Sequence, residues 1–326
     1  MRRRKFITLL GGTMAAWPLA AGAQQAMPVI GYLGGRSPKT DVPMLSAFRQ
    51  GWSETGYVEG NNVAIEFRWA GGQFDPLPGL VADLVRRRVA VIVTSGGPAP
   101  ALAAKAATTT IPVLFVTAGD PVQEGLVASL SRPGGNVTGV GTFFTALGAK
   151  QLGLMRDLLP NTDLFALLID PHMASAELQA VETEAAGRAT GQRFLVLKAS
   201  SEGEIDSAFA TLIAQRAGAI FVLASPFFFT RAHYLITLAA RHSLPAMYFR
   251  RELVEAGGLM SYGTSTAETY RQLGNYAGKI LSGVKPAELP VIQSTKFEFV
   301  INLQTARALG LTIPPGLLAI ADEVIE

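Results

Sequence analysis

The sequence predicts an α/β fold of two Rossmann-like lobes, each built on a core of parallel strands, with three chain crossings that form a hinge. The main observation is a pair of strand series. Short apolar segments that recur about every 25 to 35 residues have the spacing of strand–helix repeat units. The first series begins near Val29, Val63, Val89 and Val113, and the second begins near Leu164, Phe194, Ala219 and Ala246. Two series of similar spacing indicate two copies of one architecture.

The segments between the predicted strands carry apolar residues at helical spacing. Met44, Phe48 and Trp52 lie on one face of a helix that we expect to end at Gly56. The same spacing recurs in Leu77, Leu80, Val81, Leu84 and Val85, in Leu178, Val181 and Ala185, and in Ile205, Phe209, Leu212 and Ile213. A capping box from Ser201 to Glu204 begins the last of these helices. Such stripes predict helix faces that pack against the sheets.

Glycine- and proline-rich connections separate the two strand series. We expect the chain to cross between lobes at residues 134–142, 257–263 and 283–290. The expected division is residues 28–140 plus 263–286 for the first lobe and residues 141–262 plus 287–326 for the second. Gly139, Gly141 and Gly263 permit backbone rotation, so we expect the lobes to close about these crossings.

The first 23 residues have the organisation of an export signal. Residues 2–5 are basic, residues 6–19 are mildly apolar, and Ala21-Gly22-Ala23 is a small-x-small cleavage sequence. The run Arg3-Arg4-Lys5-Phe6-Ile7 also resembles the twin-arginine export motif. We expect an exported, periplasmic protein whose signal peptide, residues 1–23, is cleaved near Ala23. An ordinary Sec signal and an uncleaved anchor are the alternatives.

Charge and cysteine content exclude several classes of protein. The formal net charge is +3, and without the four basic residues at positions 2–5 it becomes about −1, so we expect no nucleic-acid partner. The sequence has Cys 0, which excludes disulfides, a thiol nucleophile and thiolate metal sites. No segment beyond residue 30 is long and uninterrupted enough to span a bilayer. Cys 0 also excludes the lipidated cysteine that tethers many exported bacterial proteins, so we expect the mature chain to be soluble.

Two polar turns at the ends of neighbouring strands predict one wall of a small-molecule site. Strand 91–94 is followed by Ser95-Gly96-Gly97, and strand 113–116 is followed by Thr117-Ala118-Gly119-Asp120. In an open parallel sheet, the loops at the carboxyl ends of the strands form the ligand crevice. Unpaired amides at the start of the alanine-rich helix 99–108 would favour an anion. The expected ligand-binding residues of this wall are Ser95, Gly96, Gly97, Thr117, Ala118 and Asp120.

A short polar residue followed by proline ends three of the predicted strands, at Asp120-Pro121, Asp170-Pro171 and Ser225-Pro226. Asp or Ser at the N-cap with Pro in the first turn is a helix-capping pattern. A cap at the carboxyl end of a parallel strand also faces the crevice. Asp170 and Ser225 are therefore candidates both for capping and for ligand contact.

Signatures of enzymes are missing from the sequence. It has no Gly-x-Gly-x-x-Gly after the first strand, no phosphate-binding loop and no Gly-x-Ser-x-Gly elbow. No pair among His172, His233 and His242 has metal-ligand spacing. We expect no catalytic residue, metal or cofactor. An exported enzyme acting in the same cleft and a ligand-sensing partner of a membrane sensor are the alternatives to a transport receptor.

Several motifs resemble one known family over essentially the whole chain. They are the amino-terminal residues 3–12 and 16–20, the turn 117–122, the segments 126–130 and 132–139, the segment 257–263, and the segments 296–303 and 308–312. Together they are similar to the tryptophan-importer-like family of ABC-transporter substrate-binding proteins. The resemblance implies the type I periplasmic-binding-protein fold, with the ligand between the lobes. It also implies an ABC-importer permease with its ATPase as partner, and we expect a monomer. Many relatives carry Asn-Pro-Asn where Asp170-Pro171-His172 stands, and Asp where Ser225 stands.

We expect the ligand to be a small carboxylate, an amino acid with an apolar or aromatic side chain. Its carboxylate would meet the hydroxyls of Ser95 and Thr117 and the amides of Gly96 and Gly97, and its ammonium group would pair with Asp120. Tyr248 and one ring of Phe227 to Phe229 would accept the side chain, with Arg251 at the rim. A neutral sugar is the competing ligand.

Overall fold

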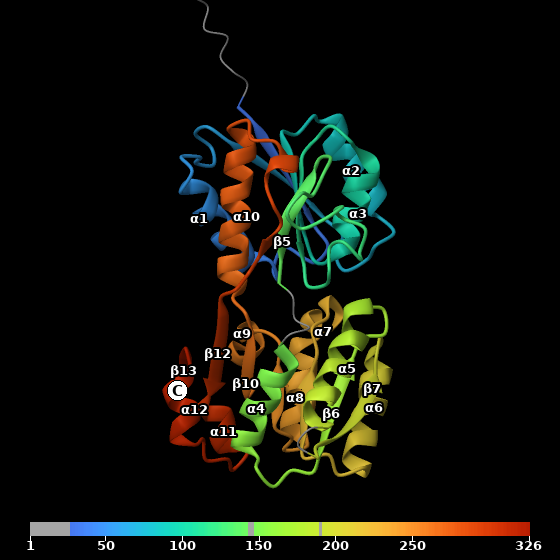
Figure 1. Cartoon of the computed structure of the whole chain (residues 1–326), viewed down its shortest axis with the longest axis vertical. Coiled ribbons are helices and arrows are strands. Elements are labelled where there is room, and N and C mark those ends of the chain that lie inside the picture. The colour runs from blue at the N-terminus through green and yellow to red at the C-terminus, as the bar shows by residue number, and fades with distance from the viewer. Residues whose placement is uncertain (1–26, 143–146, 189–190) are drawn as a thin grey trace, which may run out of the picture.

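The computed structural model describes residues 27–142, 147–188 and 191–326. The expected signal peptide, residues 1–23, lies outside the described residues. The predicted α/β class is confirmed, because the chain forms two mostly parallel sheets, each covered by helices on both faces (Figure 1). Within the described ranges no helix has the length and apolarity needed to cross a membrane.

The first lobe contains a six-stranded sheet in the order β11-β5-β4-β3-β1-β2, and every pairing in it is parallel. Its strands are β1 (Val29–Gly34), β2 (Ala64–Trp69), β3 (Val91–Ser95), β4 (Val113–Thr117), β5 (Val137–Gly141) and β11 (Ile292–Gln293). Helices α1 (Val42–Ser53) and α10 (Thr266–Leu281) cover one face, and α2 (Leu77–Arg86) and α3 (Pro98–Ala107) cover the other. The central strands β1, β3, β4 and β5 are buried on both faces, which explains their nearly continuous apolar sequences.

The second lobe contains a seven-stranded sheet in the order β13-β12-β10-β9-β8-β6-β7, in which only the β10–β12 pairing is antiparallel. Its strands are β6 (Leu164–Ile169), β7 (Arg193–Lys198), β8 (Ala219–Val222), β9 (Ala246–Tyr248), β10 (Met260–Thr264), β12 (Phe297–Asn302) and β13 (Glu323–Ile325). One face is covered by α6 (Glu202–Ala214), α7 (Pro226–Thr230), α8 (Ala232–Arg241) and α9 (Arg251–Glu255). The other is covered by α4 (Gly148–Leu158), α5 (Ala174–Arg188), α11 (Leu303–Ala308) and α12 (Pro315–Ile320).

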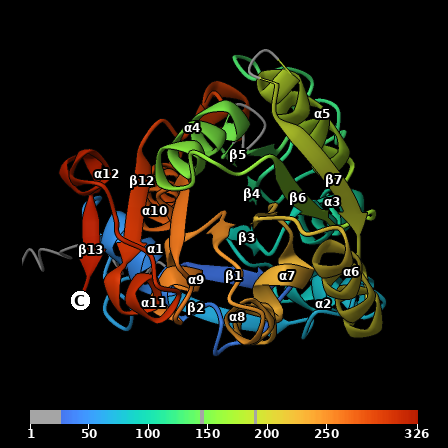
Figure 2. The same cartoon turned by 90° about the horizontal axis from the view of Figure 1, so that it is seen from below.

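The chain passes from one sheet to the other after β5, after β10 and after β11. Residues 292–293 pair with β5 in the first sheet, whereas the expected division assigns them to the second lobe. Figure 2 shows the lobes from below, with β13 and α12 on the side of α1 and with β7 and α6 on the side of α2. The chain leaves β5, β10 and β11 at their carboxyl ends to cross between the sheets, so the carboxyl ends of the strands parallel to them face the junction between the lobes. Strands β12 and β13 run in the opposite direction.

Close approach of neighbouring backbones explains two glycines that we expected to act as hinges. Gly139 lies in β5 and Gly263 in β10. A Cβ at Gly139 would overlap the carbonyl oxygen of Phe115, and a Cβ at Gly263 would overlap that of Phe249. Adjacent strands thus require glycine at these positions, whether or not the backbone rotates there.

Helices α1 and α10 pack against each other with their backbones in direct contact. A Cβ at Gly51 would overlap the carbonyl oxygen of Arg271, and a Cβ at Gly274 would overlap that of Phe48. Arg271 also donates a hydrogen bond of 2.7 Å to Glu54 across the pair.

Two of the expected apolar stripes are partly wrong. Leu178 and Val181 of α5 are exposed, and Ile213 of α6 is also exposed.

Candidate ligand-binding site

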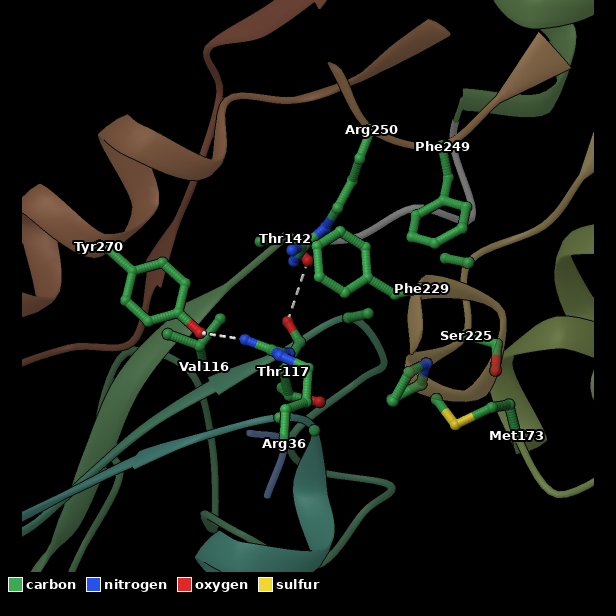
Figure 3. Close-up of a pocket in the computed structure, with 15 residues that line it drawn as sticks. Arg36, Val116, Thr117, Thr142, Met173, Ser225, Phe229, Phe249, Arg250 and Tyr270 are labelled. Carbon is green, nitrogen blue, oxygen red and sulfur yellow. Dashed lines mark hydrogen bonds between the residues drawn. The ribbon is translucent and has the colours of Figure 1, made fainter. Parts of the chain in front are cut away.

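A pocket lies between the lobes and encloses about 520 Å³ free of protein atoms, part of it open to solvent (Figure 3). The first lobe contributes Arg36, Gly96, Gly97, Val116, Thr117, Ala118, Thr142 and Tyr270, and the second contributes Met173, Ala224, Ser225, Pro226, Phe229, Phe249 and Arg250. Most of these residues end or follow the carboxyl ends of strands, where parallel sheets place their ligands.

Arg36 follows β1 and is held in the first wall of the pocket by a buried network. Its Nε lies 2.7 Å from Oδ1 of Asp41. Its Nη2 donates to the hydroxyl of Ser95 at 3.0 Å and to the hydroxyl of Tyr270, on α10, at 3.3 Å. Only 5% of Arg36 is exposed. Burial lowers the pKa of Arg36, but its interactions with Tyr270 and Asp41 together raise that pKa above the ordinary value.

The carboxylate of Asp41 is the centre of this network and has no exposed surface. In addition to Arg36, it accepts hydrogen bonds from the hydroxyl of Tyr32 at 3.0 Å and from the hydroxyl of Ser95 at 2.7 Å. Asp41 stands at the N-cap position of α1 but makes no side-chain capping bond. The ion pair and its hydrogen bonds leave the carboxylate fully engaged, as a buried charge requires.

Arg250 lies at the start of α9, in the opposite wall. Its Cζ is 5.3 Å from the ring centroid of Phe229, and the Cζ of Arg36 is 5.5 Å from the same centroid. Figure 3 shows both side chains extending into the pocket, one from each lobe. Among the described residues, no side chain forms a hydrogen bond or a salt bridge with the Arg250 guanidinium. Burial lowers the pKa of Arg250; the negative charge of Glu252 opposes this shift, and the nearby Arg36 adds to it.

The glycine turn after β3 lies in the pocket wall, as does the turn after β4. Gly96 and Gly97 have φ angles of 95° and 100°, which favour glycine over other residues. Within the described ranges, neither of their amides donates a hydrogen bond. Thr117 lines the pocket, but its hydroxyl donates to Glu124 at 2.6 Å. Burial raises the pKa of Glu124; the bond from Thr117 opposes this shift, and Asp120 adds to it. Ala118 contributes apolar surface.

Ser95 and Tyr248 do not line the pocket. Ser95 is fully buried behind it, where its hydroxyl bonds to Asp41 and, at 2.8 Å, to the hydroxyl of Tyr270. Tyr248 is 1% exposed and belongs to the core of the second lobe, where its ring packs against Gly258. Ser95 was expected in the turn after the strand but is the last residue of β3, and Tyr248 is the last residue of β9; both side chains are buried.

Each of the three residues before proline accepts at least one hydrogen bond from a backbone amide that follows it, but of the three only Ser225 is the N-cap of a helix. Asp120 accepts from the amides of Val122 at 2.8 Å and Gln123 at 3.4 Å, and it does not line the pocket. Residues 121–125 form turns rather than the expected helix, and Gly125 ends them with a φ of 73°. The Ser225 hydroxyl accepts from the amides of Phe227 and Phe228 and donates to Asp170 at 2.6 Å, so the surface it adds to the pocket carries no free donor.

Asp170 lines a second hollow beside the pocket, together with His172 and Arg231. One of its oxygens accepts from the Ser225 hydroxyl at 2.6 Å, and the other accepts from the His172 amide at 3.0 Å. Arg36, Gly96, Met173 and Pro226 line both cavities. The described part of the chain contains no group of three acidic or histidine side chains that could hold a metal ion.

Sequence reasoning missed Arg36, Thr142, Arg250 and Tyr270. Two of them could have been found by the rule used for the glycine turns, because Arg36 follows β1 and Arg250 follows β9. Both were overlooked because arginine beside a strand end is most often a surface residue. Tyr270 could not have been found in this way, since it lies within α10.

Comparisons with known proteins agree with this architecture. The family model described as ABC transporter substrate binding protein matches residues 42–325. A tyrosine-binding protein of Clostridioides difficile (strain R20291) is 23% identical over 281 residues, which are 85% of this chain and 80% of the relative.

Two solved structures extend the comparison. The structure of an ABC domain in complex with L-Trp from Streptococcus pneumonia has 27% identity and a TM-score of 0.83, covering 91% of this chain and 99% of that one. A glucose-galactose binding protein from Geobacillus stearothermophilus has 14% identity and a TM-score of 0.61, over 84% of this chain and 97% of its own, and shares the fold.

Proposed function

The chain belongs to the family of ABC transporter substrate-binding proteins, and from this premise we propose that it is the exported receptor of an ABC importer. It is a binding protein rather than an enzyme. We propose that it captures a small ligand with a carboxylate and an apolar or aromatic group between its lobes. It would work as a monomer that delivers the ligand to a membrane permease coupled to an ATPase. The basic and apolar residues of the first 23 positions support export.

The observation that carries the ligand class is the guanidinium of Arg250, which lines a pocket with aromatic walls and has no side-chain partner among the described residues. Arg250 is only partly exposed, and a partly buried charge without a partner is costly, so a ligand that brings the opposite charge gains more than it would at the surface. An arginine can grip a carboxylate with two parallel hydrogen bonds. The amides of Gly96 and Gly97 lie in the same pocket and could add further donors.

Phe229 and Phe249 offer the apolar surface for the rest of the ligand. Aromatic rings contribute large buried area and favour edge-to-face or offset contact with another ring. Two relatives support a ligand related to the aromatic amino acids, since one is named a tyrosine-binding protein and another was solved with L-Trp. Tyr248, Ser95 and Asp120 have no ligand contact in this proposal, because their side chains lie outside the pocket wall.

Equilibrium dialysis of the exported protein against a metabolite mixture, followed by mass spectrometry, tests the proposal. We expect enrichment of an aromatic carboxylate without turnover. Calorimetry with the captured compound should then show at least a tenfold loss of affinity for Arg250→Gln, about 1.4 kcal/mol. Arg231→Gln is the matched control, because Arg231 also lies over a phenylalanine ring but has Glu202 as its partner. Capture of a neutral sugar, or an unchanged affinity in Arg250→Gln, would overturn the ligand class.

A further inference from the structure

We propose that the pocket recognises its ligand as an anion and forms no ion pair with an α-ammonium group. A deaminated aromatic acid should then bind at least as tightly as the corresponding amino acid. The inference rests on the proposed function, because it assumes that a carboxylate occupies the pocket beside Arg250. An amino acid carries an α-carboxylate and an α-ammonium group, and the inference is that the pocket has residues to bind only the carboxylate.

The charged groups of the pocket wall are all positive. Arg36 and Arg250 line it, and no aspartate or glutamate among the described residues does so. Residues 143–146 follow the pocket residue Thr142 and lie outside the described residues, but their sequence, Phe-Phe-Thr-Ala, contains no carboxylate. An ammonium group in this pocket would therefore have two cationic neighbours and no anionic one.

The carboxylates of the first lobe that lie closest to the pocket wall already have donors. Asp41 accepts from Tyr32, Arg36 and Ser95 behind the wall. Asp120 accepts from two backbone amides of its own turn.

Glu124 accepts from the hydroxyl of Thr117 and does not line the pocket. None of Asp41, Asp120 and Glu124 lines the pocket, so an ammonium group of a ligand held at Arg250 has none of these carboxylates in its wall.

Among the described residues, Asp170 is the one carboxylate that lines the adjoining hollow, so it is the most serious alternative. Its two oxygens accept from the Ser225 hydroxyl and the His172 amide, and 5% of the residue is exposed. A ligand held at Arg250 would have to pass Met173 and Pro226, which line both cavities, to reach it. Asp170 thus has a structural role at the ends of β6 and β8, where it fixes the Ser225 cap.

An ammonium group that enters this pocket loses hydrogen bonds to water without gaining a charged acceptor. Burial of an unpaired charge is unfavourable, and repulsion from Arg36 and Arg250 adds to that penalty. A ligand carboxylate is stabilised in the same pocket, because it becomes the anionic partner of the Arg250 guanidinium. The same pocket therefore favours the acid over the zwitterion of equal shape.

Calorimetry with two pairs of probes tests the inference: L-phenylalanine against 3-phenylpropanoate, and L-tryptophan against 3-indolepropanoate. We expect each acid to bind at least as tightly as its amino acid. The amine 2-phenylethylamine, which keeps the ammonium group but lacks the carboxylate, should bind at least about 100-fold more weakly than 3-phenylpropanoate. Arg250→Gln should weaken both acids, and Arg231→Gln should weaken neither.

Asp170→Asn separates the remaining outcomes. We expect the ratio of acid to amino-acid affinity to be the same in this variant as in the wild type. If the amino acids bind more than tenfold tighter than the acids and lose that advantage in Asp170→Asn, the inference is wrong and Asp170 is the ammonium site, while the proposed function stands. If the advantage persists in Asp170→Asn, the inference is also wrong. If neither member of either pair binds, the proposed ligand class itself fails.

Discussion

Arg36 in the first lobe and Arg250 in the second lie at nearly the same distance from the ring of Phe229, yet their surroundings differ in every other respect. Arg36 has a carboxylate and two hydroxyls as partners, whereas Arg250 has no polar side-chain partner among the described residues. The comparison distinguishes two roles that a charged side chain can have in a pocket. A charge whose partners come from the protein is part of the scaffold, and a charge without them is available to a ligand.

Replacing each arginine by methionine should give the largest contrast. Arg36→Met leaves Asp41 buried without its cation, so we expect the free energy of unfolding to fall by about 3 to 5 kcal/mol. Arg250→Met removes an isolated charge from an apolar pocket, so the unliganded protein should stay within about 1 kcal/mol of the wild type or become more stable. Urea unfolding without ligand measures both variants.

The double replacement Arg36→Met with Asp41→Asn is the control, because it removes both charges of the pair. It should recover part of the stability lost in Arg36→Met alone. Equal losses in Arg36→Met and Arg250→Met would mean that the two arginines do not differ in the way proposed.

Phe229 connects the two walls, so its removal should affect ligand capture more than folding. Phe229→Leu keeps an apolar side chain but removes the ring that both guanidinium groups face. We expect a loss of about 1 to 2 kcal/mol in the affinity for 3-phenylpropanoate, measured by calorimetry. Phe227→Leu is the matched control, since Phe227 faces Arg231 and does not line the pocket. The comparison fails if the two variants lose the same affinity.

Asp120 should have a smaller effect, on stability alone. It caps a turn through the amides of Val122 and Gln123, so Asp120→Ala should lower the free energy of unfolding by about 1 kcal/mol. Asp120→Asn keeps an acceptor for both amides and should be close to neutral. Neither change should alter the affinity for L-phenylalanine by more than about twofold. A tenfold loss in Asp120→Asn would restore Asp120 as the partner of an ammonium group.

The smallest effect we predict is a pH dependence from Glu124. Burial raises its pKa in the folded state above the ordinary value of 4.5, so the folded protein binds this proton more tightly than the unfolded chain does. The resulting stabilisation is complete below pH 4.5 and is lost as the pH rises through the folded-state pKa. The stability of the wild type relative to Glu124→Gln should therefore fall over that range in urea titrations. Parallel profiles for the two proteins would contradict this.

The sequence allowed the sheets to be predicted because each strand is a short apolar run at the spacing of a repeat unit. It also identified the turn after β3 and the turn after β4, because glycine and short polar residues favour turns, and turns at the carboxyl ends of parallel strands line the crevice. The sequence pattern does not show which way a side chain at a strand end points. We therefore expected the Ser95 hydroxyl to line the pocket, whereas it is buried behind the pocket wall. The network around Arg36 could not be foreseen, because Tyr270 is 234 residues away along the chain.

The pairing of α1 with α10 also governs when the first lobe can form. Arg271 and Glu54, which join these helices, are 217 residues apart in sequence, and strands β6 to β10 of the second lobe are encoded between them. The ribosome must therefore release most of the chain before α1 can be covered. Until then its apolar face, with Phe48 and Trp52, stays open to chaperones, proteases and aggregation. Contacts of such long range also slow folding. The second lobe likewise needs the end of the chain, because its sheet includes β12 and β13.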